Sequence, residues 1–86
     1  MHAVVVKVTL SAQADPTVLR EQVVPRVSQV PGFVAGYWTR KDESGLSIVV
    51  FESEENARAG SEQVPSMLPE DVTLESNEVV EVVAHA

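Results

Sequence analysis

The strand-like segments of this chain carry apolar residues at both alternating positions, and this pattern limits the fold more than any other feature. In segment 2–10, the neighbours Val4 and Val5 point to opposite sides, and segments 46–52 and 79–83 repeat the pattern. A strand with one solvent-facing side instead alternates apolar and polar residues. The pattern therefore predicts a sheet that is covered on both faces.

Turn and helix signals separate these segments into six elements. Asp15-Pro16 starts a helix and Pro31-Gly32 ends it, because Pro fits the first helical turn and Gly the position after the last. The polar segment 41–45 joins strands 33–40 and 46–52 as a hairpin. A second helix follows, and the last strand lies within 72–84. The predicted order is strand, helix, strand, strand, helix, strand.

Prolines are expected to interrupt both helices. Pro25 lacks the amide hydrogen that would bond to Glu21, which predicts a kink or break near residues 21–24. In the second helix, Ser53 is the predicted N-cap, and Pro65 and Pro69 are expected to shorten or break the helix. The apolar stripe of the first helix is Leu19, Val23, Val27 and Val30. That of the second is weaker, with Ala57, Ser61, Val64 and Leu68.

These elements predict an α+β fold of the ferredoxin-like type, βαββαβ, formed by residues 1–86 as one domain. Right-handed crossovers place both helices on one face of a four-stranded antiparallel sheet. The other face is then apolar and open, which is typical of an interaction surface. The simplest cover is the same face of an identical chain, so we predict a homodimer that packs sheet to sheet; a different partner protein is the alternative.

Composition excludes several classes of function. The net charge is −7 and the six Lys and Arg residues are scattered, so neither nucleic acid nor an anionic membrane is an expected partner. The chain has no cysteine, which rules out disulfides and thiolate chemistry. Since neither a membrane span nor a secretion signal is recognisable, a cytoplasmic protein is expected.

Two adjacent aromatic residues are the first candidates for a ligand pocket. Tyr37 and Trp38 are the only tyrosine and tryptophan, and as strand neighbours they point to opposite faces. Either one can line a cavity between helices and sheet, or pack in the core or a dimer contact. Arg40 is the third candidate, because it follows Trp38 by two residues and can bind an acidic group. The alternative for Arg40 is a solvated or salt-bridged strand end.

The remaining polar residues do not form a recognisable catalytic set. His2 and His85 lie near the two chain ends on strands predicted to be neighbours, but two histidines alone make an incomplete zinc site. No metal and no cofactor is therefore expected. Glu75, Glu78 and Glu81 are spread over both faces of the last strand, which indicates a solvated edge.

Three segments resemble one known family. They are Pro31–Trp38 (PGFVAGYW), Val49–Glu55 (VVFESEE) and Glu78–Ala84 (EVVEVVA). They are similar to the entry into the second strand, the strand-to-helix junction and the closing strand of antibiotic-biosynthesis-monooxygenase-like (ABM-like) proteins, in the dimeric α+β barrel superfamily. The order of elements matches over nearly the whole chain. The asparagine–tryptophan–histidine set of the haem-degrading branch is not matched.

The resemblance implies a small dimeric α+β barrel protein that binds or oxidises a small aromatic molecule without a cofactor. The alternatives are a non-catalytic ligand-binding or regulatory dimer and a plain protein-interaction module. Whether the chain is an enzyme stays open at this point, because the matching motifs belong to the fold and not to a reaction. Small residues at Ala57, Gly60 and Ser61 either leave a cavity or bring the helix close to the sheet.

Overall fold

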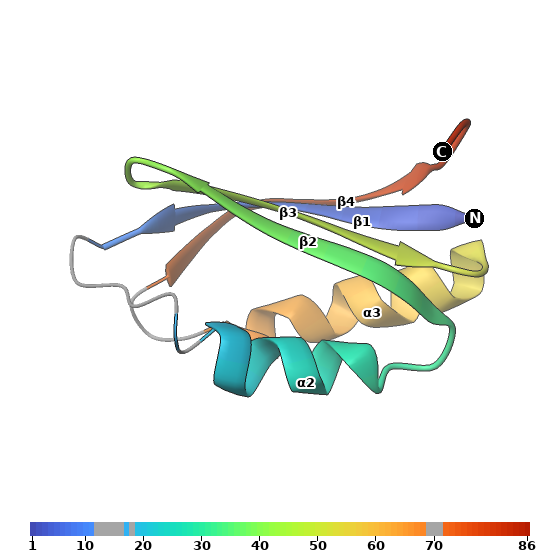
Figure 1. Ribbon diagram of the computed structural model, residues 1–86, viewed down its shortest axis with the longest axis horizontal. Coiled ribbons are helices and arrows are strands. Elements are labelled where there is room, and N and C mark those ends of the chain that lie inside the picture. Colours follow the sequence, from blue (N-terminus) through green and yellow to red (C-terminus); the bar gives the residue numbers. More distant parts are fainter. Residues whose placement is uncertain (12–16, 18, 69–71) are drawn as a thin grey trace.

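The computed structural model describes residues 1–11, 17, 19–68 and 72–86. It contains one sheet layer and one helical layer (Figure 1). The elements follow the predicted order: β1 (His2–Leu10), the π-helix η1 (Leu19–Val23) continuing into α2 (Val24–Ser28), β2 (Phe33–Lys41), β3 (Ser44–Phe51), α3 (Glu54–Met67) and β4 (Val72–Glu81). The sheet is antiparallel with strand order β2-β3-β1-β4. The fold is therefore ferredoxin-like α+β.

Both helical segments cover the same face of the sheet, and the opposite face has no cover from the described chain (Figure 1). The core lies between the two layers. Its buried members are Val4, Val6, Val8, Leu10, Val23, Val27, Val30, Val49, Phe51 and Ala57. The predicted stripe of the first helix is confirmed at Val23, Val27 and Val30, while the side chain of Leu19 and the start signal Asp15-Pro16 lie outside the described residues.

The predicted break before Pro25 is confirmed. The helix has π geometry over Leu19–Val23 and returns to α geometry at Val24, so that Pro25 lies in the first turn of α2, where no intrahelical donor is needed. The wider π turn thus includes Glu21, whose carbonyl oxygen would bond to the amide of residue 25 in a regular α-helix and has no such donor because residue 25 is proline.

The prediction for Pro65 is wrong, because α3 continues through it to Met67. Proline cannot bond to the carbonyl oxygen four residues before it, which here belongs to Ser61. The side-chain amide of Asn77 on β4 donates to that oxygen at 2.8 Å. A group from the sheet therefore replaces the missing helical bond. Pro69 lies outside the described residues.

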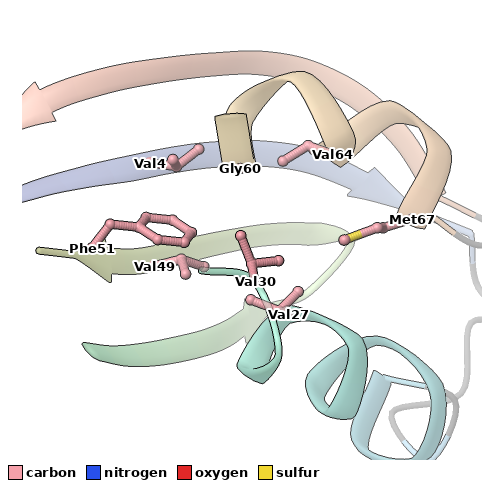
Figure 2. A pocket seen from close by; sticks show the side chains of 8 residues that line it. All are labelled: Val4, Val27, Val30, Val49, Phe51, Gly60, Val64 and Met67. Carbon is pink, nitrogen blue, oxygen red and sulfur yellow. The ribbon is translucent and has the colours of Figure 1, made fainter. Parts of the chain in front are cut away.

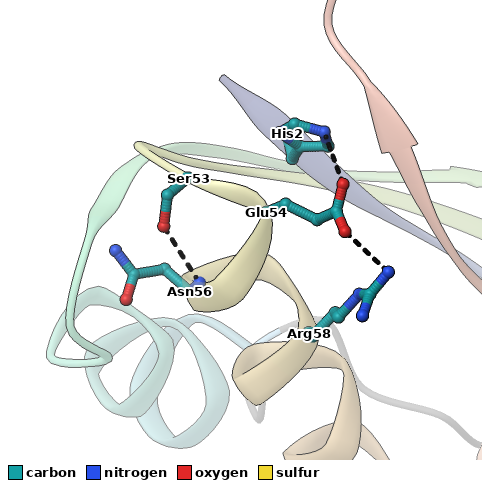
Figure 3. A network of polar contacts seen from close by, with 5 residues as sticks. All are labelled: His2, Ser53, Glu54, Asn56 and Arg58. Carbon is teal, nitrogen blue, oxygen red and sulfur yellow. Dashed lines mark hydrogen bonds and ion pairs between the residues drawn. The ribbon is translucent and has the colours of Figure 1, made fainter.

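The N-terminus of α3 follows the prediction. The Ser53 hydroxyl accepts a hydrogen bond from the Asn56 amide at 3.1 Å, as expected of an N-cap, and Glu54 and Glu55 occupy the first turn (Figure 3). The hairpin between β2 and β3 is tighter than predicted. Its strands extend to Lys41 and from Ser44, so that only residues 42–43 form the turn, with Asp42 at φ 54°.

The strand register shows that the open face changes character along its length. Four rows of cross-strand neighbours, numbered 1 to 4, cross this face, and each is written in the strand order β2, β3, β1, β4. The first two are Ala35-Val50-Ala3-Val80 and Tyr37-Ile48-Val5-Glu78, and the last two are Thr39-Leu46-Lys7-Ser76 and Lys41-Ser44-Thr9-Thr73. The expectation of an apolar open face therefore holds only for row 1 and, apart from the exposed Glu78 on the edge strand β4, for row 2. Rows 3 and 4 are mostly polar, with Leu46 the one large apolar residue.

Candidate functional site

Three small apolar cavities form a row between the helices and the sheet. The first lies beneath Gly60 and is bordered by Val4, Phe51 and Met67, with a volume of about 30 Å³ (Figure 2). The second, about 40 Å³, shares Val49, Val64 and Met67 with the first. The third, about 50 Å³, shares Val23, Trp38, Ser47 and Leu68 with the second. Because neighbouring cavities share wall residues, the three lie next to one another and together form one candidate site.

Two glycine residues let aromatic rings of the cavity walls pack closely against the backbone. A Cβ atom at Gly60 would lie 2.6 Å from Cζ of Phe51, so the absence of a side chain lets the ring pack under α3. A Cβ atom at Gly36 would lie 2.7 Å from Cη2 of Trp38, so the indole ring packs over the backbone of β2. The absence of side chains on these glycines thus lets both rings pack against the backbone, and at Gly60 the structure shows both alternatives left open by the sequence: α3 lies close to Phe51, and a small cavity remains beside it.

Trp38 and Ser47 give the row its polar groups. The two residues are cross-strand partners on β2 and β3, and both line the second and third cavities. Trp38 carries an N–H donor, and the Ser47 hydroxyl is both a donor and an acceptor. The remaining lining is largely aliphatic. A ligand that suits this site is flat and apolar, with one hydrogen-bonding group.

Trp38 and Ser47 belong to a line of inward-facing cross-strand neighbours that continues through Val6 to Asn77. At the β4 end of this line, Asn77 forms two hydrogen bonds with α3. Asn77 lies opposite Val6 on β4 and faces α3. Its Oδ1 accepts a hydrogen bond from the Ser61 hydroxyl at 2.8 Å, and its amide binds the Ser61 carbonyl. This paired contact fixes α3 against β4, and so sets one wall of the cavities.

The three predicted site residues separate in the structure. Trp38 lines the inner cavities, whereas Tyr37 is 63 % exposed on the open face, so the two aromatics point to opposite faces as expected. Arg40 lies at the exposed end of β2, and its Nε donates to the Asp42 carbonyl at 3.2 Å in the hairpin turn. Their ligand-binding function stays a prediction.

Sequence reasoning missed Ser47 and Asn77. Ser47 had a detectable signal, since it is a polar residue at an inward position between Leu46 and Ile48. Asn77 had none. β4 carries a bulge at Glu75, where the register with β1 shifts, and the extra residue reverses the alternation along the strand.

A second polar cluster lies at the N-terminal end of α3 (Figure 3). The Glu54 carboxylate lies 3.3 Å from Nε2 of His2 through one oxygen and forms an ion pair with the Arg58 guanidinium at 2.6 Å through the other. The cluster joins β1 to α3, and Nδ1 of His2 is buried without a hydrogen-bond partner. Within the described part of the chain, no group of three His, Asp or Glu side chains is placed to hold a metal ion.

Comparisons with known proteins support the fold alone. No family model and no curated protein matches the chain. Among solved structures, a mutant of MhuD with two manganese protoporphyrin IX molecules bound per active site is similar at a TM-score of 0.70 and 18 % identity. The alignment covers 100 % of this chain and 98 % of that one. The likeness shows the ferredoxin-like α+β fold, which agrees with the strand order and the placement of both helices on one face.

The residues present do not fit a porphyrin between the helices and the sheet. Neither histidine lines the cavities: His2 contacts Glu54 beyond the far end of the row, and His85 lies in the exposed C-terminal segment after β4. The chain has no cysteine, and Tyr37 faces the other side of the sheet. The cavities are also an order of magnitude smaller than sites for large organic ligands, which measure about 300–1,000 Å³.

No described helix has both the length and the apolar character needed to cross a membrane.

Proposed function

We propose that this protein is a homodimer that binds a small aromatic molecule in the row of cavities between its helices and sheet. The observation that carries the proposal is that Trp38 and Ser47 both line the second and third of these apolar cavities. Flat aromatic molecules match an apolar site with few polar groups. A single-ring ligand needs roughly 150 Å³, so Leu68 and Met67 must move outward when it binds.

The side chains around these cavities favour binding over acid–base catalysis. The described lining consists of aliphatic, aromatic, thioether and hydroxyl side chains and glycine, with no titratable group among the residues that border the three cavities. General acid–base catalysis needs a positioned group with a pKa near the working pH. A non-catalytic ligand-binding dimer is therefore the first form of the proposal.

Oxidation of the bound molecule by dioxygen is the second candidate function. The ABM-like fold favours it, because the family that the sequence resembles contains cofactor-free oxygenases on aromatic polyketides. Oxygen consumption in the presence of aromatic quinols separates the two candidates. Consumption that depends on the protein and is lost in Trp38→Leu supports oxidation, whereas binding without consumption supports the non-catalytic form.

Methyl-resolved NMR tests the binding proposal. Titration with 2-naphthol, a flat molecule with one hydroxyl group, is expected to shift methyl signals of Val6, Val49 and Leu68 in a saturable way. The methyl groups of Val5 and Ile48, on the open face, serve as the internal control. Shifts confined to the open face, or no saturation, contradict the proposal.

The dimer is proposed from rows 1 and 2 of the open face. Ile48 is 37 % exposed, Val80 36 % and Tyr37 63 %. Complete burial of an exposed valine or isoleucine side chain contributes about 1.5–3 kcal/mol, and since Ile48 and Val80 are each only about one-third exposed, each contributes a fraction of that and the pair depends on rows 1 and 2 together. Packing of rows 1 and 2 against the same rows of a second copy, related by a two-fold axis, covers all of them.

A further inference from the structure

The polar half of the open face contains a hollow that adjoins the third inner cavity at Val8, Thr39 and Gly45 but has its charged lining residues on the open face. It spans rows 3 and 4 and has a volume of about 440 Å³. Sites for small organic molecules measure about 300–1,000 Å³, so the hollow has the size of a ligand site. It is lined by Lys7, Val8, Thr9, Thr39, Lys41, Ser44, Gly45, Leu46 and Glu75.

Two lysines lie on opposite sides of the hollow. Lys7 is in row 3 on β1 and Lys41 is in row 4 on β2, with β3 between them. Strand and residue spacings place their Cα atoms roughly 12 Å apart. Both side chains have flexible four-carbon stems, so the two ammonium groups can reach one ligand from opposite ends.

Neither lysine of the hollow is held in an ion pair by the described residues. Within the described residues, the ion pairs involve Glu54 with His2 and Arg58, and neither lysine has a carboxylate within 4.0 Å. Glu75 is the one acid in the lining, and its Oε1 accepts a hydrogen bond from the Thr9 hydroxyl at 2.7 Å. The lining therefore contains two ammonium groups and one carboxylate, in a chain whose net charge is −7.

The floor between the lysines is apolar in its centre and polar beside it. Leu46 lies directly between Thr39 and Lys7 in row 3, and Ser44 adjoins Lys41 in row 4. A ligand with an acidic group at each end and a short aliphatic middle matches this order. Its acidic ends contact the ammonium and hydroxyl groups, while its methylene groups lie over Leu46.

We propose that this hollow binds a small dicarboxylate, with one carboxylate on Lys7 and the other on Lys41 and Ser44. Charge-assisted hydrogen bonds from ammonium to carboxylate supply the recognition. The site uses rows 3 and 4 of the open face, so the proposal does not depend on ligand binding at Trp38.

An amide NMR titration with glutarate tests this site. The full chain is titrated at constant ionic strength, with propionate as the matched monocarboxylate. Glutarate is expected to give saturable shifts at the amides of Thr9, Ser44 and Leu46, and propionate is expected to bind at least tenfold more weakly. Equal shifts from propionate, from sodium chloride or from inorganic phosphate would show simple charge screening and overturn the proposal.

Three variants separate the site from the overall charge of the chain. Lys7→Met and Lys41→Met keep most of the side-chain stem and are each expected to weaken glutarate binding at least tenfold. Arg26→Met removes an exposed positive charge on α2 and is the matched control. The amide spectrum of each variant also reports whether it is folded. Unchanged affinity in both lysine variants, or an equal loss in Arg26→Met, overturns the proposal.

Discussion

The side-chain amide of Asn77 binds the carbonyl oxygen that Pro65 leaves without a helical partner. Pro65 is inside α3, and the carbonyl four residues before it is that of Ser61, which accepts from Asn77 at 2.8 Å. The Ser61 hydroxyl returns a bond to Asn77 at 2.8 Å. A strand residue thereby makes a proline tolerable within the helix that covers the candidate site.

This relationship predicts an energetic coupling between Asn77 and Pro65. Asn77→Ala leaves the Ser61 carbonyl unpaired and is expected to lower the free energy of unfolding by about 1–3 kcal/mol. In a Pro65→Ala background the amide of residue 65 can bond to that carbonyl, so the loss is expected to fall by about 1 kcal/mol. Urea unfolding of the four chains measures both values. Equal losses in the two backgrounds would show that Asn77 does not replace the helical bond.

Gly60→Ala is predicted to disturb the packing of Phe51. The new Cβ atom would lie 2.6 Å from Cζ of a ring that is 2 % exposed. Overpacking typically costs about 1–3 kcal/mol, which exceeds the roughly 1 kcal/mol that alanine gains over glycine in a helix. A net loss of up to about 2 kcal/mol is therefore expected in thermal unfolding. The variant Ala59→Gly, at an exposed neighbouring position, measures how much the difference in helix propensity between alanine and glycine alone changes the stability. A net gain in stability for Gly60→Ala would contradict close packing here.

Leu68→Ala is predicted to enlarge the candidate site. Leu68 lines the second and third cavities and packs against the core, so its truncation joins their volumes. We expect a loss of about 2–4 kcal/mol in stability together with tighter binding of single-ring aromatic molecules. Isothermal titration with indole checks the second effect. Leu46→Ala, on the open face, is the control and is expected to leave indole binding unchanged; tightening in the control would place the ligand elsewhere.

Ile48→Glu is predicted to dissociate the proposed dimer. Its charge would be buried in row 2 of the open face, at a cost of several kcal/mol. Sedimentation velocity is expected to show a dimer for the natural chain and a monomer for the variant. Thr73→Glu adds the same charge to row 4 and is expected to remain dimeric. A monomeric natural chain at working concentration would contradict the pairing.

The sequence was sufficient to predict the order of elements, the break before Pro25 and the opposite orientations of Tyr37 and Trp38. These features depend on local rules: proline lacks a donor, and strand residues alternate. Features that depend on contacts distant in sequence could not be predicted in the same way. Pro65 is tolerated because of Asn77, twelve positions along the chain, and no local pattern shows that.

The candidate site was predictable only in part. Trp38 was identified from its type and its place on a strand, but the same reasoning could not choose its face over that of Tyr37. The bulge at Glu75 reverses the alternation of β4, so the inward position of Asn77 was hidden. Valine runs predicted a fully apolar open face, yet Lys7 and Lys41 make its second half polar once the register is known.

The fluorescence of Trp38 tests the central claim most directly, because it is the only tryptophan and lines the cavities. The natural chain and Ser47→Ala are each titrated with 2-naphthol, and the fluorescence of Trp38 is followed. The intensities are corrected for light that 2-naphthol itself absorbs. The account predicts saturable quenching in the natural chain and weaker binding in Ser47→Ala. A blue-shifted emission that does not respond to ligand would mean that Trp38 is packed in a closed core, and would contradict the proposed binding site.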